Sequence, residues 1–250
     1  MSGLLWALLF AWAGLLVLTG CGGGNPYTLG SFDRGEFFYE KGAYHDAVLT
    51  LEAFVRQNPT DSLAARAQYL KAISYMELKE YPLAIVEFQI LRKDFPTSDL
   101  IEVSYFQEGV TNFRQVGRVE RDVSGIYTAR QIFQRMLQLY PGTEYAGEIQ
   151  DYLRRISDII VRKGLNAADV YRHIGQRYAV KITLESLLES ERASGLLDVV
   201  LFQLAENAEK IEEFEEAIQA YSRLIQEYPD SQFARVSQKR LKRLTEASQP

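Results

Sequence analysis

The chain has 250 residues, of which 47% are hydrophobic and 24% charged, and its formal net charge is −5. This length and apolar content are enough to build a sizeable core, and they exclude an intrinsically disordered chain. The mild acidity argues against a nucleic-acid-binding protein, because such a protein needs a basic face.

The first 32 residues carry no charged side chain, and Leu4 to Leu18 form an apolar run. This run is shorter than the ~20 residues that a transmembrane helix needs and is typical of a signal-peptide core. It ends in Leu18-Thr19-Gly20-Cys21, which resembles the lipobox of bacterial lipoproteins. The resemblance implies a signal peptide over residues 1–20 and a lipid-modified Cys21 as the first residue of the mature chain. The alternative is an incidental cysteine after a transmembrane helix.

Cys21 is the single cysteine of the chain, so no disulfide forms within it. Residues 21–30 are therefore predicted to be the lipidated cysteine and a flexible tether, in which Gly22 to Gly24 have low helix propensity. In enterobacterial lipoproteins an Asp after the cysteine marks retention at the inner membrane, and here Gly22 follows it. The resemblance thus favours a lipid anchor in the outer membrane of a Gram-negative bacterium, with the chain facing the periplasm.

The rest of the chain repeats one pattern, in which a small residue and an aromatic residue three positions later precede an Ala, two large apolar residues and a Pro. This order is typical of the tetratricopeptide repeat, a pair of antiparallel helices. A degenerate fourth unit fits the spacing but has Arg192 where Pro is expected. We therefore predict an all-α fold, an α-solenoid (superhelix) of about five repeats, with repeats 1–3 in residues 31–141 and repeats 4–5 with a capping helix in residues 142–250. The matching residues are Gly35, Phe38, Ala47, Leu51, Phe54 and Pro59; Ala72, Tyr75, Ala84, Phe88, Leu91 and Pro96; Gly109, Ala129, Phe133, Met136 and Pro141; Ala168, Tyr171, Val180, Leu184 and Leu187; and Ala205, Ala208, Ala217, Tyr221, Leu224 and Pro229.

The joints between units also repeat. Two residues after each Pro stands Asp61, Ser98, Thr143 or Ser231, residue types that cap the next helix at its N-terminus. The period is interrupted by about eight inserted residues near Gln115 to Gly125 and by an additional helix over Glu144 to Gly164, which Gly164 or Asn166 is expected to break or cap.

The sequence contains no motif that is typical of a catalytic, metal or cofactor site. His45 and His173 lie in different repeats, and no cluster has the spacing of metal ligands. Carboxylates such as Glu212 and Glu216 are expected to lie on solvent-exposed faces of helices. We therefore predict no enzyme, no metal and no cofactor, while an enzyme acting on peptidoglycan stays open as a third hypothesis.

A binding groove is the better candidate, because stacked repeats line their concave side with the first helix of each unit. The positions expected to point inward lie three residues before the small residue, and one and four residues after it. They form an aromatic and apolar set, which we expect to be exposed for a partner or peptide. The alternative is that they face an additional N-terminal segment or a neighbouring helix. The set comprises Phe32, Tyr39, Tyr69, Ile73, Met76, Phe106, Val110 and Phe113, with Glu36 beside them.

The lipobox, the repeat number and the third unit, with Val119 to Asp122 ahead of Ala129 to Phe133, together resemble the BamD family of β-barrel assembly lipoproteins. The joints Tyr140 to Tyr145 and Tyr228 to Phe233 resemble it as well. The resemblance implies a periplasm-facing outer-membrane scaffold with no nucleic-acid partner. Its expected partners are a BamA-like barrel subunit at the C-terminal repeats, other assembly lipoproteins, and the C-terminal signals of unfolded outer-membrane proteins at the N-terminal repeats. The alternative is another repeat lipoprotein, such as a pilotin, a protease adaptor or an envelope-division factor.

Overall fold

The computed structural model describes residues 27–116 and 124–247. The predicted signal peptide, Cys21 and the family-like segment Val119 to Asp122 lie outside the described residues. Within the described ranges the chain forms helices and no strand. The helices are α1 (Phe32–Glu40), α2 (Tyr44–Gln57), α3 (Ala64–Glu77), α4 (Tyr81–Asp94), α5 (Ile101–Gln115), α6 (Ser124–Leu139), α7 (Ala146–His173), α8 (Arg177–Ser190), α9 (Leu197–Lys210), α10 (Phe214–Glu227) and α11 (Ala234–Ala247).

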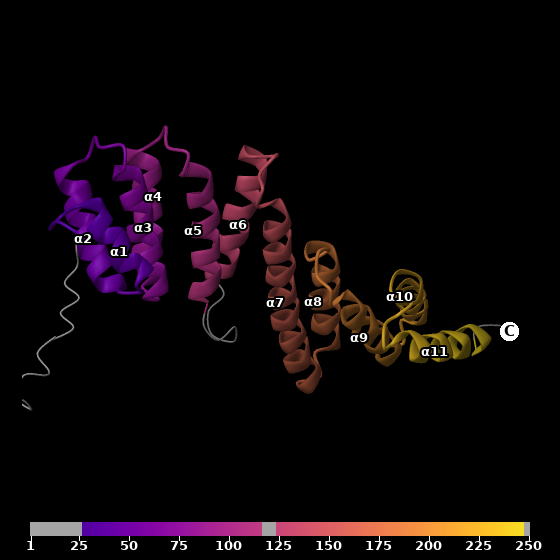
Figure 1. Cartoon of the computed structure of the whole chain (residues 1–250). Helices are drawn as coiled ribbons and strands as arrows, with labels where there is room; N and C mark the ends of the chain where they lie inside the picture. The colour runs from indigo at the N-terminus through magenta and orange to yellow at the C-terminus, as the bar shows by residue number, and fades with distance from the viewer. Residues whose placement is uncertain (1–26, 117–123, 248–250) are drawn as a thin grey trace, which may run out of the picture.

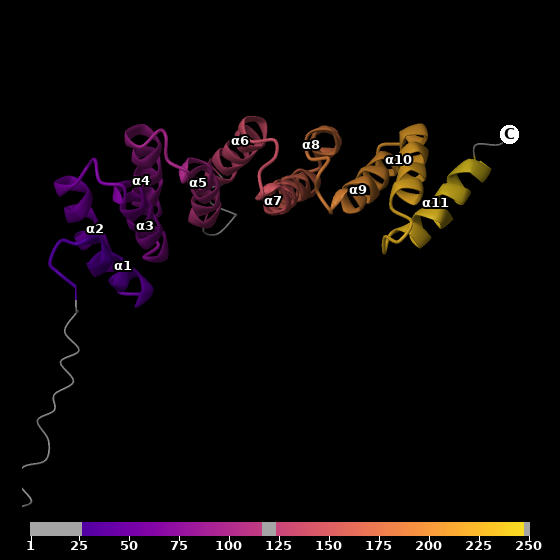
Figure 2. The same ribbon diagram turned by 45° about the horizontal axis from the view of Figure 1, so that its top comes forward.

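The helices follow one another along an elongated molecule, in the order of the sequence (Figures 1 and 2). Five antiparallel pairs, α1–α2 through α9–α10, are followed by α11 at the C-terminal end. The helix direction turns along the row, so that α11 lies at a steep angle to α5 in Figure 1. The predicted all-α solenoid of about five repeats is confirmed.

The core lies between the two helices of each pair and continues between neighbouring pairs. The Ala residues and the large residues of the repeat pattern are almost fully buried, among them Ala47 with Leu51, and Ala84 with Phe88. In two units the small residue is a glycine. A Cβ built on Gly35 would lie 2.5 Å from Leu51 Cδ2, and one on Gly109 would lie 2.5 Å from Phe133 Cε1. The small residue is therefore required because the partner side chain lies directly over the backbone.

Gly164 shows the same contact in the fourth unit, and the expectation that it breaks or caps a helix is wrong. Helix α7 runs without interruption for 28 residues, from Ala146 to His173. A Cβ on Gly164 would lie 2.7 Å from the Leu187 Cδ atoms of α8. The glycine is thus kept for close helix packing, and the predicted additional helix is the N-terminal part of α7, up to Gly164. Within the described residues no helix combines the length and the apolarity that crossing a bilayer needs.

The turns inside the pairs need a left-handed backbone at one position. Gly42, Lys79, Gly175 and Glu212 occupy it, with φ of 72°, 62°, 77° and 64°. Glycine adopts this conformation without a steric penalty, whereas Lys79 and Glu212 adopt it against one.

The joints between units differ in detail from the prediction. Helices α2, α4, α6 and α10 each end two residues before a Pro, as expected. Asp61 and its counterparts, however, stand three residues before the next helix, and their side-chain oxygens accept a hydrogen bond from the backbone N–H two residues on. These bonds measure 2.8 Å for Asp61, 3.2 Å for Ser98, 3.2 Å for Thr143 and 3.1 Å for Ser231. They hold a turn that leads into the helix. Ser194, which the pattern did not single out, does the same at 3.1 Å between units four and five.

Buried ion pairs link successive units. Arg92 on α4 pairs with Glu108 on α5, and both side chains are largely buried. Arg130 on α6 pairs with Glu191, at the end of α8, at 2.6 Å, and also donates to Ser157 on α7 at 3.4 Å. Since a buried charge is tolerated only with a well-placed partner, these pairs fix the relative position of neighbouring repeats.

Two glycine substitutions test the assignment of backbone roles. Gly175→Ala places a Cβ at positive φ and should lower the free energy of unfolding by about 1 kcal/mol. Gly147→Ala lies in the first turn of α7, where a Cβ has no neighbour within 4 Å, and should raise it by about 0.5 kcal/mol. Urea unfolding followed by circular dichroism measures both. Equal effects of the two substitutions would contradict the assignment.

Candidate interaction surfaces

The predicted N-terminal groove is mostly closed in the structure, which corrects the expected exposure of five of its residues. Phe32, Ile73, Met76, Phe106 and Val110 are all less than 10% exposed. Only Tyr39, Tyr69 and Phe113 remain half-buried. The alternative interpretation, in which these side chains face a neighbouring helix, therefore holds for most of the set.

Aromatic side chains of α7 close the groove over the third unit. Tyr145, just before α7, stacks on Phe106 with ring centroids 4.6 Å apart. Tyr152 of α7 stacks on Phe133 at 5.1 Å and meets Phe113 edge-on at 5.2 Å. The Arg155 guanidinium lies 4.7 Å from the centre of the Phe113 ring. Contacts of this kind add to the burial of apolar area, so Phe106 and Phe113 belong to a junction between repeats.

The first two units close in a similar way. Phe32 packs edge-on against Phe54 at 5.9 Å. Met76 receives a hydrogen bond from the Thr111 hydroxyl of α5 at 3.2 Å to its sulfur. Tyr69 lies between neighbouring helices, where burial raises the pKa of its phenol to about 12. This phenol stays protonated at neutral pH and can donate a hydrogen bond.

Exposed apolar side chains occur instead near the end of the α7–α8 pair, two from each helix region. Val170 and Ile174 lie one turn apart at the end of α7, and Tyr178 and Ile182 lie one turn apart on α8. Their exposed fractions are 60%, 64%, 65% and 66%. We call these four residues the α7–α8 tip. Sequence reasoning missed it, although apolar residues beside the repeat positions of the degenerate unit were a signal for it.

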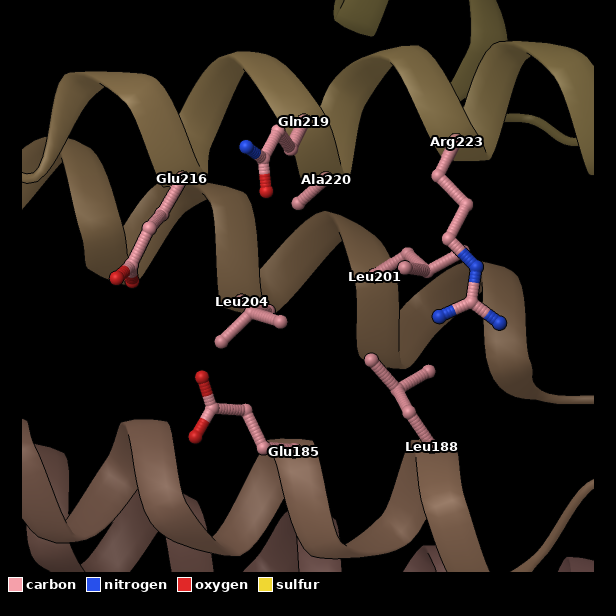
Figure 3. Close-up of a pocket in the computed structure, with 8 residues that line it drawn as sticks. All are labelled: Glu185, Leu188, Leu201, Leu204, Glu216, Gln219, Ala220 and Arg223. Carbon is pink, nitrogen blue, oxygen red and sulfur yellow. The ribbon is translucent and has the colours of Figure 1, made fainter.

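A hollow with an apolar floor lies between α8, α9 and α10 (Figure 3). Its volume is about 280 Å³. Leu188, Leu201 and Leu204 form the floor, the Glu185 and Glu216 carboxylates lie at one end, and the Arg223 guanidinium lies at the other. A second hollow of about 340 Å³ shares Leu188 and Arg223 with it, so the two are adjacent. Such a groove can take apolar side chains of a partner between charged neighbours.

Some of the charged side chains on the rim of this hollow form ion pairs. Lys181 pairs with Glu216, and it also pairs with Glu213 at 2.7 Å. The hydrogen bond from Lys181 lowers the pKa of the Glu216 carboxyl, although burial opposes the shift. Glu216 is therefore an ionised, structural carboxylate, which does not suit the role of a general acid.

Metal binding has no arrangement to support it among residues 27–116 and 124–247, where no three His, Cys, Asp or Glu side chains are placed to hold an ion. His45 and His173 lie on different helices, α2 and α7. The surfaces described above suit binding to other macromolecules.

Comparisons with known proteins identify a lipoprotein family and a repeat. The family model described as outer membrane lipoprotein (YfiO) matches residues 29–191, and a tetratricopeptide repeat model matches residues 199–231. The chain is 21% identical over 175 residues to the outer membrane protein assembly factor BamD of Caulobacter vibrioides, a match that covers 70% of this chain and 57% of that protein. The chain thus spans just over half the length of this curated relative. Among solved structures it is similar to a thermophilic TPR protein of Thermus thermophilus, with 19% identity, a TM-score of 0.34 and coverage of 84% of this chain and 95% of that chain.

The closed groove predicts that Phe106 is a stability residue. Phe106→Ala should lower the free energy of unfolding by about 3–5 kcal/mol, because it removes a buried ring and leaves a cavity. Tyr127→Ala, which truncates a ring that is 46% exposed on the neighbouring helix α6, should change it by no more than about 0.5 kcal/mol. Urea titration of both variants measures the difference, and similar midpoints for the two would show that Phe106 is not packed.

Proposed function

The chain belongs to the outer membrane lipoprotein family, and from this membership we propose that it is a non-enzymatic scaffold of the β-barrel assembly machinery. In this role a lipid on Cys21 anchors it in the outer membrane, and the repeats face the periplasm. It holds a BamA-like barrel subunit together with other assembly lipoproteins, and it binds unfolded outer-membrane proteins.

The α7–α8 tip is the observation that carries the scaffold role. Its four apolar side chains lie within the residues that the family model matches. Exposed large apolar side chains are candidates for a protein contact, and the resemblance assigns the barrel subunit to the C-terminal repeats. We therefore assign the α7–α8 tip to the contact with the barrel subunit.

Substrate binding has a weaker basis in the free chain. Tyr39, Tyr69 and Phe113 are the members of the predicted groove that retain exposed area. They could stack on the aromatic residues of a C-terminal signal. The other five members of the set are buried and would first have to become exposed. A substrate would therefore contact these three side chains.

The α7–α8 tip can be tested without disturbing the core. In the Ile174→Ser, Ile182→Ser variant, the barrel subunit recovered by affinity purification from solubilised membranes should fall at least about tenfold, which corresponds to 1.4 kcal/mol of binding energy. A matched control is Leu49→Ser, Leu83→Ser, which removes two exposed leucines of α2 and α4 and should leave recovery unchanged. Undiminished recovery with the tip variant would exclude this contact. Recovery of pilus, protease or division proteins in place of the barrel subunit would favour the alternative adaptor role.

The lipid anchor has a separate test. Cys21→Ala removes the thiol that accepts the lipid, and combining it with the tip substitutions removes the proposed protein contact as well. This variant should leave the outer-membrane fraction and appear as a soluble periplasmic protein or an uncleaved precursor. Metabolic labelling with a radioactive fatty acid checks the modification directly. If the combined variant is mature, unlabelled and still bound to the membrane, the anchor is contradicted.

A further inference from the structure

A basic pocket lies in the C-terminal half. It shares no lining residue with the groove of Figure 3, and two of its residues, Arg172 and Arg177, come from the segment that carries the α7–α8 tip. Its volume is about 460 Å³. Figure 1 shows α9 between α7 and α11, and residues from the end of α7, the start of α8, α9 and α11 line the pocket. The lining contains five cationic side chains and two carboxylates, in a chain whose net charge is −5. The lining residues are Arg172, Arg177, Glu206, Asn207, Glu209, Lys210, Arg240 and Arg243.

Three of the cationic side chains form ion pairs with carboxylates. Arg240 pairs with Glu206 at 2.7 Å and with Glu209 at 3.1 Å, and Arg243 pairs with Glu209 at 2.5 Å. Arg172 pairs with Asp169 of its own helix. Burial alone would raise the pKa of Glu209, but hydrogen bonds from Tyr221 and Arg240 lower it, so this carboxylate stays ionised.

The other two cationic side chains of the pocket have no carboxylate partner among the described residues. Among the described residues neither the Arg177 guanidinium nor the Lys210 ammonium forms an ion pair. They lie on the same pocket, one at the start of α8 and the other at the end of α9. Together they leave positive charge that a carboxylate can neutralise through charge-assisted hydrogen bonds.

Asn207 adds an independent sign of a ligand. It is 2% exposed, and its Nδ2 donates to the Arg177 carbonyl oxygen at 3.0 Å. This bond fixes the orientation of the amide, and Oδ1 then has no hydrogen-bond partner within the described chain. Buried side-chain acceptors are rarely left unpaired in folded proteins. Oδ1 is covered in the free chain, so a ligand that offers a hydrogen-bond donor would satisfy it once the side chains over it move aside.

We propose that this pocket binds an acidic peptide segment, with a side-chain carboxylate at Arg177 and Lys210 and a backbone N–H at Asn207 Oδ1. A peptide carries both groups within one residue. The phosphodiester group of a phospholipid carries the charge but no donor. The hydroxyls or ammonium of its headgroup could supply one, so the vesicle experiment below separates a lipid from a peptide. The proposal goes beyond the scaffold role and does not rest on it, because the purified chain alone should bind the peptide.

The test uses a fluorescein-labelled peptide in which Asp alternates with Leu, acetylated and amidated at its ends, and measures fluorescence anisotropy with the purified mature chain. The Arg177→Gln, Lys210→Gln variant should bind at least about tenfold more weakly. Its unfolding midpoint should stay unchanged, because neither side chain forms an ion pair. The matched control, Arg235→Gln, Lys239→Gln, removes the same charge from exposed positions of α11 that do not line the pocket, and it should bind like the unaltered chain.

Three outcomes would overturn the proposal. A peptide with Asn in place of Asp that binds equally well would show that the carboxylate is not recognised. An equal loss of affinity in the α11 control would reduce the effect to general charge attraction. Binding to phosphatidylglycerol vesicles that depends on Arg177 and Lys210, without binding of the acidic peptide, would assign the pocket to lipid headgroups.

A probe methylated at its backbone nitrogens tests the Asn207 contact, and it should bind several-fold more weakly than the parent peptide.

Discussion

The whole solenoid depends on the close approach of the two helices in each repeat. At Gly35, Gly109 and Gly164 even a Cβ would lie within 2.7 Å of a side chain of the partner helix. Ala72, Ala168 and Ala205, all fully buried, hold the position of Gly35 and Gly109 in the second, fourth and fifth units, and Gly164 lies one turn before Ala168. Because the small residue brings the backbones together, the large residues of the second helix reach across and fill the core. Every later feature follows from this spacing, since it sets the faces that the pairs present to one another.

Contacts between the pairs have a different character. The buried apolar residues form four clusters, and between the second and third units the junction is partly polar. There Arg92 pairs with Glu108, and Gln89 also donates to Glu108 at 2.9 Å.

The fourth unit also has a charged joint. Glu191 stands where Phe95, Tyr140 and Tyr228 stand at other joints, and its ion pair with Arg130 spans α7. What looks degenerate in the sequence is an aromatic joint replaced by a charged one. Since removing one partner of a buried pair leaves an unpaired charge, the position of α8 relative to α6 is strongly specified.

The repeat period predicted the fold well because it encodes the packing inside each pair. Leu51, Phe88 and Phe133 are buried where the pattern placed them. The period carries no information on what covers the other side of a first helix. Phe106 and Met76 were therefore expected to face water, whereas Tyr145 and Thr111 of the following elements cover them. A glycine is equally ambiguous in a sequence, because a helix break and a close contact both require one, and only the partner Leu187 decides for Gly164. The free acceptor of Asn207 depends on the single bond to Arg177 and has no sequence signal.

The distribution of exposed and buried groups bears on where this chain recognises its partners. The N-terminal half commits its aromatic side chains to junctions between repeats, and exposing one of them again costs about 2 kcal/mol for each large apolar side chain. A partner that binds there must recover this cost from its own contacts. The C-terminal half presents the α7–α8 tip and the basic pocket already open in the free chain. A partner at the α7–α8 tip would keep all of its contact energy, because no core side chain has to move. Recognition there would be rigid, whereas a partner of the N-terminal half would be limited to the side chains that retain exposed area unless the repeat junctions loosen.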